Sequence, residues 1–363
     1  MSKAAELAAL IANVNNGSSL ANKNFIINGA MNVAQRNTSS TGIGASSGYF
    51  TLDRWNIYAL NTAGRLTMTQ DSSGPSGFAN SLKLACTTAD TSIAAGENLL
   101  LQQRIEGQNL QAFAKGTSDA KPFAVSFYVK GNASATYICE LHDQDNGRQI
   151  SKTFNVTTAW TRIELTFPAD TTGAFDDDNA RSLNLNIALH AGSTYTSGTL
   201  STTWTSNTNA NRYVGGSSFF DSTSRTFFIT GVQLEIGEKA TAFEHEPFSV
   251  TLKKCERYFE KTQSYSTAGT SWESGGGVSL RDGTASTVVR YYRFNYKTRK
   301  RASSPTITTY DALSASGKCK IDSTQGITTA IFSSGEGSWC MYPDTSISHY
   351  GISAMAWTSE SEL

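Results

Sequence analysis

Strict alternation of apolar and polar side chains over residues 45–248 constrains the fold of this chain more than any other feature. The clearest apolar sets are Phe123, Val125, Phe127, Val129 and Leu183, Leu185, Ile187, Leu189. Side chains two residues apart lie on the same face of a strand, so each set marks the buried face of a strand. Clusters of Gly, Asn and Asp at 131–132 and 145–147 separate these runs. The pattern predicts an antiparallel β-sandwich over residues 23–248, with a bulge at Gly231 where the alternation changes phase.

Two short stretches show helical spacing instead. Residues 3–15 place Leu7, Leu10, Ile11 and Val14 at i, i+3, i+4 and i+7, and residues 249–261 place Leu252, Cys255, Tyr258 and Phe259 on one face. Three helical turns are marginal alone, so each apolar stripe needs a partner. We expect an anchor or oligomer-forming helix within residues 1–22, with packing on its own domain as the alternative, and a helical neck over residues 249–261. Runs at 288–296 and 306–310 predict a smaller C-terminal β domain over residues 262–363.

The composition excludes several classes of protein. Lys+Arg and Asp+Glu each total 30 among 363 residues. A neutral chain lacks the excess of Lys and Arg that neutralises phosphates, so we expect no nucleic-acid partner. No run approaches the length of a membrane-spanning segment, and no secretory signal is visible, so we expect assembly in a cytoplasm without membrane insertion. Five scattered cysteines favour free buried thiols over a disulfide framework, with a Cys319–Cys340 bridge as the alternative.

No motif predicts a catalytic residue, a metal or a cofactor. The four histidines have no second ligand at a metal-binding spacing, and no G-x-S-x-G motif is present. The acidic residues Glu140, Asp143, Glu164 and Asp176 show no spacing that distinguishes an acid from a base. The cluster Asp176, Asp177, Asp178 fits a solvated turn, with a calcium site as the alternative. The basic run at 297–301 fits a solvated loop.

A glycan-binding face is the one ligand site that the pattern supports. Sugar sites combine aromatic rings, which stack on the sugar, with amide and hydroxyl groups that bind its hydroxyls. Tyr128, Asn184, Asn186 and His190 fall opposite the inward apolar rows, so we predict that they line an outer sheet face. Ordinary packing is the alternative for each aromatic residue of the sandwich.

Several segments resemble those of known proteins in the same order along the chain. They are NFIINGAMNVAQR at 24–36, DRW at 53–55, LQQRIEG at 101–107, VSFYVKG at 125–131, ITGVQLEIG at 229–237, AFEHEP at 242–247, CERYF at 255–259, RKRASSPTIT at 299–308 and SESEL at 359–363. Together they resemble fibre and related virion proteins of tailed bacteriophages. The strand segments are also similar to those of jelly-roll carbohydrate-binding modules. Tyr128 stands where these proteins usually have Trp, so the choice of ligand does not transfer.

The resemblance implies a jelly-roll sandwich in a virion structural protein, with no catalytic residues. We therefore predict a homotrimeric tail-fibre subunit that attaches to other virion proteins through its N-terminal segment and binds a host surface glycan. The alternatives are a capsid decoration protein without a host ligand, a glycan-degrading tailspike and a cellular carbohydrate-binding module.

Overall fold

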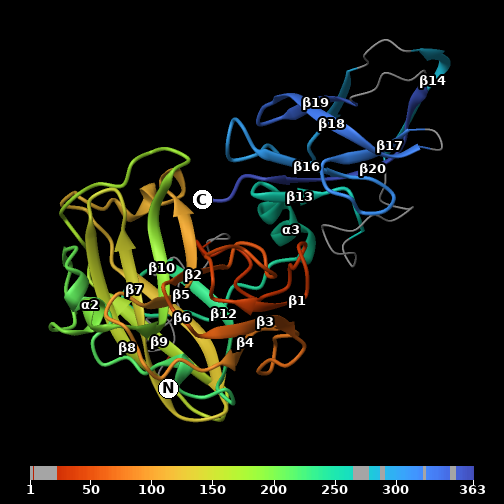
Figure 1. The fold of residues 1–363 in the computed structure, drawn as a ribbon. Helices are drawn as coiled ribbons and strands as arrows, with labels where there is room; N and C mark the ends of the chain where they lie inside the picture. Colours follow the sequence, from red (N-terminus) through yellow and green to blue (C-terminus); the bar gives the residue numbers. More distant parts are fainter. Residues whose placement is uncertain (1–2, 4–22, 265–277, 287–290, 322–323, 344–348) are drawn as a thin grey trace.

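The computed structural model describes residues 3, 23–264, 278–286, 291–321, 324–343 and 349–363. The predicted helix with Leu7, Leu10, Ile11 and Val14 lies outside the described residues. Figure 1 shows a β-sandwich and a separate C-terminal β domain, with α3 (Phe248–Glu256) between them. No helix of the described residues has both the length and the hydropathy of a membrane span.

Two six-stranded sheets form the sandwich in the described part of the chain. Sheet A has the order β1 (Ser39–Ile43), β3 (Arg65–Asp71), β4 (Ser81–Thr88), β12 (Thr226–Ile236), β6 (Phe123–Gly131), β9 (Thr161–Phe167). Sheet B has the order β11 (Thr205–Ser206), β8 (Arg148–Val156), β7 (Ala135–Asp143), β10 (Arg181–Ala191), β5 (Asn98–Glu106), β2 (Asn56–Leu60). Every pairing within these sheets is antiparallel, which confirms the predicted fold class.

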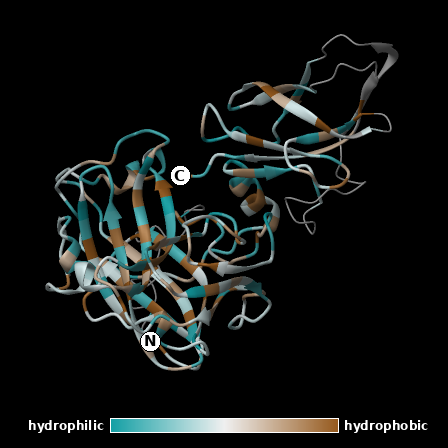
Figure 2. Cartoon of the chain, viewed as in Figure 1, coloured by the Kyte–Doolittle hydropathy of each residue, from teal (hydrophilic) through white to brown (hydrophobic). Residues whose placement is uncertain are grey.

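The core lies between the two sheets and follows the alternation read from the sequence. Phe127 of β6 and Leu185 of β10 are fully buried, and both belong to one apolar cluster with side chains from sheets A and B. Figure 2 shows the resulting change of hydropathy from one residue to the next along the strands. Gly231 adopts a left-handed φ of 62°, and the β12–β6 register shifts between Thr230 and Gln233. The predicted bulge is therefore present.

The C-terminal domain is a second, smaller β unit. Its sheet has the order β13 (Phe259–Lys261), β20 (His349–Glu360), β17 (Lys318–Ile321), β18 (Thr324–Ser334), β19 (Ser338–Pro343), β15 (Tyr292–Asn295), and β14 (Val278–Ser286) and β16 (Thr306–Tyr310) also pair with β20. Trp339, Met341 and Trp357 belong to its apolar core. All five cysteines are free and buried, as expected.

The neck differs from its prediction. Helix α3 ends at Glu256, and Phe259, which the spacing placed on the helix, lies in strand β13. Cys255, Tyr258 and Phe259 are buried within the chain itself, while Leu252 is half-buried. The neck face therefore needs no second copy of the chain to cover it. The apolar side chains that α3 leaves exposed are Phe248 and Val250.

Candidate functional site

Two rows of polar side chains cross the outer face of sheet B. The first row is Asn56, Gln102, Asn186, Glu140 and Ser151, and the second is Arg104, Asn184, His142 and Gln149. Strand register places the members of each row side by side, while their neighbours along each strand point into the sandwich core. All except Arg104 are buried. We call these nine residues the sheet B polar face.

Glu140, beside Asn186 in the first row, is held by four donor atoms. Arg212 donates to both carboxylate oxygens, at 2.8 and 2.7 Å, and Asn186 and Tyr213 donate to Oε2 at 2.7 and 3.1 Å. Burial alone would raise the pKa of Glu140, but Arg212 outweighs it and keeps the pKa below its usual value. Glu140 is therefore an ion-paired carboxylate, which cannot act as a proton donor at neutral pH.

The second row contains hydrogen-bonding atoms that have no partner among the described residues. They are Asn184 Oδ1 and His142 Nε2, and Asn56 Oδ1 and Ser151 Oγ are similar cases at the ends of the first row. Burial lowers the pKa of His142 despite the nearby Glu140 carboxylate, so its imidazole is neutral at pH 7. Asn184 Nδ2 lies 3.4 Å from His142 Nδ1, and because the amide is a donor, we assign the ring proton to Nε2. His142 and Asn184 thus contact each other through Nδ1 and Nδ2, and each keeps a second polar atom without a partner among the described residues.

An aromatic residue and a small apolar cluster adjoin these rows. Tyr58 is half-buried and packs against a cluster of Leu100, Ile138, Ala188 and Tyr213 on the same face of sheet B. Tyr58 lies two residues along β2 from Asn56, a separation of about 7 Å. The face therefore offers an apolar surface next to the first row, and the unsatisfied groups of Asn184 and His142 lie one row farther away.

The structure divides the four residues predicted to line one glycan face. Asn184 and Asn186 lie together on the sheet B polar face, as expected. Tyr128 belongs to β6 of sheet A and packs against Phe78, with ring centroids 5.3 Å apart. His190 is 1% exposed, and its ring contacts Glu97 and Ser218. Tyr128 was misplaced because alternation gives the face of a strand but not the sheet to which the strand belongs. His142 and Tyr58 were missed for the same reason. His190 is in β10 with the two asparagines, but the β10–β5 register shifts between Ala188 and His190 and turns its side chain away from their face.

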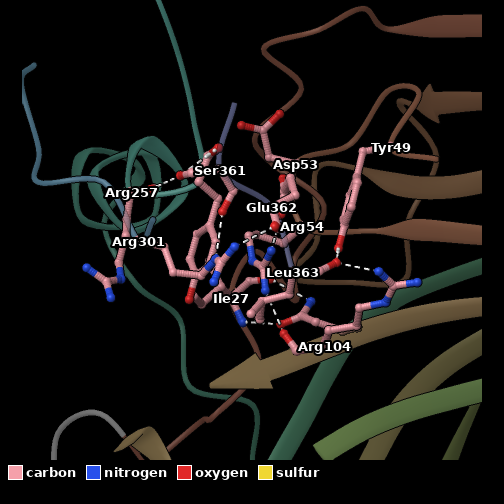
Figure 3. A network of polar contacts seen from close by, with 12 residues as sticks. Ile27, Tyr49, Asp53, Arg54, Arg104, Arg257, Arg301, Ser361, Glu362 and Leu363 are labelled. Atoms are coloured by element: carbon pink, nitrogen blue, oxygen red, sulfur yellow. Dashed lines mark hydrogen bonds and ion pairs between the residues drawn. The ribbon is translucent and has the colours of Figure 1, made fainter. Parts of the chain in front are cut away.

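Six of the nine segments that resemble phage proteins meet at a second site, between the sandwich and the C-terminal domain (Figure 3). We call it the joint, and its members are Gln35, Arg36, Asp53, Arg54, Arg104, Glu106, Arg257, Tyr258, Arg301, Ser361, Glu362 and Leu363. Gln35 donates to Asp53 Oδ2 at 2.6 Å and to the carbonyl of Phe259 at 2.9 Å. Arg257 donates to both oxygens of Glu106, at 3.0 and 2.7 Å.

The residues at 361–363 complete the joint. Glu362 forms ion pairs with Arg54 and Arg36, and the carbonyl of Leu363 accepts from Arg104 and Tyr49. Arg301 donates to the carbonyls of Ser361 and Glu362 at 2.8 and 2.9 Å. The motif residues at the joint therefore have a structural role, because their polar groups hold the sandwich and the C-terminal domain together.

The basic run at 297–301 is not the solvated loop that its composition predicted. Lys300 is fully buried, and its Nζ lies 2.6 Å from Glu260 Oε2. Burial lowers the pKa of Lys300, an effect that Glu260 opposes. Arg301 belongs to the joint. The acidic cluster at 176–178, in contrast, is exposed, as a solvated turn would be.

Comparisons with solved structures found chains of low similarity to this one. No protein-family model and no curated protein matches it. One similar structure is described as "CBM4 structure and function" (12% identity, 58% of this chain and 98% of that chain, TM-score 0.30). Another is the enzymatically active domain of tailspike protein 4 of bacteriophage CBA120 (13% identity, 59% and 22%, TM-score 0.30). A third is TmCBM61 in complex with β-1,4-galactotriose (10% identity, 59% and 99%, TM-score 0.31). These identities and TM-scores are too low for the activities of those proteins to be transferred.

Proposed function

We propose that this chain is a non-catalytic adhesion subunit of a bacteriophage particle, and that its sheet B polar face binds a glycan on the host surface. The observation that supports the ligand class is that His142 and Asn184, side by side in one row, each keep a buried polar atom without a partner among the described residues: the donor Nε2 and the acceptor Oδ1. A buried polar atom without a partner costs about 1–3 kcal/mol. Sugar hydroxyls both donate and accept, so they can satisfy atoms of either kind.

Neighbouring side chains offer further groups that could contact a sugar. Tyr58 offers a ring for a sugar face, and Asn56 Oδ1 offers a further acceptor one row away. The one carboxylate in the two rows, Glu140, is neutralised by Arg212. Glycosidases of the common kind need two carboxyl groups on either side of the bond that is cleaved, and these rows do not provide them. We therefore propose binding without hydrolysis.

The phage setting rests on the ordered resemblance of the segments at the joint to virion fibre proteins. In a homotrimer, three weak glycan sites would act together, because the first contact raises the effective concentration of the others. The N-terminal segment would attach the subunit to other virion proteins, and the assembled particle would be its location.

The binding claim is tested with an array of bacterial surface polysaccharides. Asn184→Ala and His142→Ala should each weaken binding about 5–10-fold, the loss of roughly one hydrogen bond. Thr67→Ala is the matched control, because Thr67 lies on the outer face of sheet A and should leave affinity unchanged. Equal binding by all three variants would contradict the proposed face.

The same samples separate the alternatives. A decoration protein would bind no polysaccharide on the array, and a tailspike would shorten the polysaccharide in size-exclusion chromatography. We expect binding with the length distribution unchanged.

A further inference from the structure

Two carboxylates and an imidazole converge in the sandwich, away from the sheet B polar face and the joint. Asp90, Glu97 and His190 are buried, and their ligand atoms all lie within 4.8 Å of one another. Asp90 lies in the connection from β4 to β5, Glu97 directly precedes β5, and His190 lies near the end of β10. His190 lies 93 positions after Glu97 in the chain, so no spacing motif predicted the cluster.

The cluster contains two carboxylates and one basic group, the His190 imidazole. Among the described residues, neither Asp90 nor Glu97 forms an ion pair with a lysine or an arginine. Two buried carboxylates that face each other repel, so a proton or a cation is required to hold them together. A divalent cation can contact all three ligand atoms at once, whereas a shared proton joins only two of them.

The imidazole is oriented as a metal ligand. His190 Nε2 points at the cluster and lies 3.1 Å from Glu97 Oε2, while Nδ1 lies 2.8 Å from Ser218 Oγ. Histidines that bind metals through one ring nitrogen usually donate from the other to a fixed acceptor. Ser218 is itself fixed, because its Oγ accepts from the backbone N–H of Phe220 at 3.1 Å. Thr62 and Ala63 orient Asp90 in the same way, at 3.0 and 2.9 Å.

The distances are close to those of a bound ion. Ligand atoms that share one tetrahedral ion at about 2.1 Å lie about 3.4 Å from one another. Glu97 and His190 are near that separation already, and a shift of about 1.5 Å in a carboxylate brings the third atom to it. The mixture of one imidazole with two carboxylates suits zinc and similar first-row ions better than calcium, which prefers oxygen ligands alone.

We propose that Asp90, Glu97 and His190 form a binding site for one divalent first-row transition-metal ion, with Zn²⁺ as its probe. The ion would tie the β4–β5 connection, which passes from sheet A to sheet B, to the end of strand β10. Its role would be structural, since a fixed loop at this edge holds the two sheets in register with each other.

The proposal is tested on the full chain without an affinity tag, after treatment with a chelator. We expect one Zn²⁺ per chain by elemental analysis after dialysis. We also expect a rise in Tm on the order of 5–10 °C when Zn²⁺ is present at about a hundredfold excess over its Kd. Co²⁺ in place of Zn²⁺ should give a visible absorption band. Absence of Zn²⁺ from the wild-type protein would overturn the proposal without any variant.

Variants locate the ion. Glu97→Gln and His190→Gln should each lose the bound Zn²⁺, the Tm shift and the Co²⁺ band. His245→Gln is the control, because His245 is exposed and contacts only aromatic rings among the described residues. In chelator, Glu97→Gln should be at least as stable as the wild type, because it removes one of two facing carboxylates, and the order should reverse in Zn²⁺. Retention of Zn²⁺ by both variants, or an equal Tm shift with Ca²⁺, would refute the assignment.

Discussion

Arg54 illustrates how a single charged residue is accommodated in the interior of the joint. Its side chain is 1% exposed, and it forms an ion pair with Glu362. The guanidinium lies 3.5 Å from the centre of the Tyr258 ring and donates to the carbonyl of Arg104 at 2.6 Å. A planar guanidinium can make all three contacts at once, whereas a lysine could not. Arg54 thus connects three segments that are distant in sequence.

We predict that Glu362→Gln destabilises the protein strongly. Removal of one partner of a buried ion pair leaves the other charge buried and uncompensated, which costs about 3–5 kcal/mol in the free energy of unfolding. Urea denaturation measures this cost. Glu336→Gln is the matched control, because the Arg299–Glu336 pair is exposed and its loss should cost less than about 1 kcal/mol. Equal effects of the two substitutions would show that the joint does not depend on this ion pair.

At the scale of elements, Gly29 determines how the first described segment meets strand β12. The Gly29 carbonyl accepts from the backbone N–H of Val232 at 3.0 Å. A Cβ atom on Gly29 would lie 2.1 Å from the Val232 carbonyl oxygen, which is backbone and cannot rotate away. The glycine is therefore required by a close approach of two backbones.

We expect Gly29→Ala to lower the free energy of unfolding by about 1–3 kcal/mol, because β12 or the 24–36 segment must shift to admit the methyl group. Differential scanning calorimetry should show a lower Tm for this variant. Gly337→Ala serves as the control, since a Cβ there meets no atom within 4 Å. A Tm for Gly29→Ala equal to that of the control would rule out the close approach.

Strands with strict alternation of apolar and polar residues were predictable from the sequence, but the strands with which they pair were not. Strand β16 begins and ends at the residues that the sequence indicated, and Gly231 marks the bulge in β12. Alternation is a pattern of residues two positions apart, so it can be recognised without knowledge of the rest of the fold. Sheet order and register depend on contacts between distant strands. This is why Tyr128 was assigned to the wrong sheet, and why the convergence of Asp90, Glu97 and His190 was invisible in the sequence.

The polar residues of the joint show a second limit of prediction from sequence. The segments that contain Gln35, Arg36 and Arg54 were recognised by resemblance, but their role was not. Charged residues usually indicate solvent or chemistry, but Arg36 and Arg54 are largely buried because both pair with Glu362 from the other domain. Gln35 likewise donates to the carbonyl of Phe259. Only the three-dimensional structure reveals that pairing.

At the scale of the whole molecule, oligomerisation is the main prediction still to be tested. Cys255, Tyr258 and Phe259 are covered within the chain. We therefore assign the trimer contacts to the predicted helix with Leu7, Leu10, Ile11 and Val14. We expect light scattering to give the mass of three copies for the full chain and of one copy for a chain without residues 1–20. The same mass for both chains would contradict a trimer held by this segment.

The joint also determines when the protein can become complete during synthesis. Arg54 and its partner Glu362 are separated by 308 positions in the chain. A ribosome that adds about 5–20 residues per second needs roughly 15–60 s to cover that distance. Throughout this interval a nascent sandwich carries an unneutralised guanidinium at the surface that its second domain will later cover. Early termination or slow translation after the sandwich should therefore yield a chain whose interdomain surface stays open to chaperones and proteases.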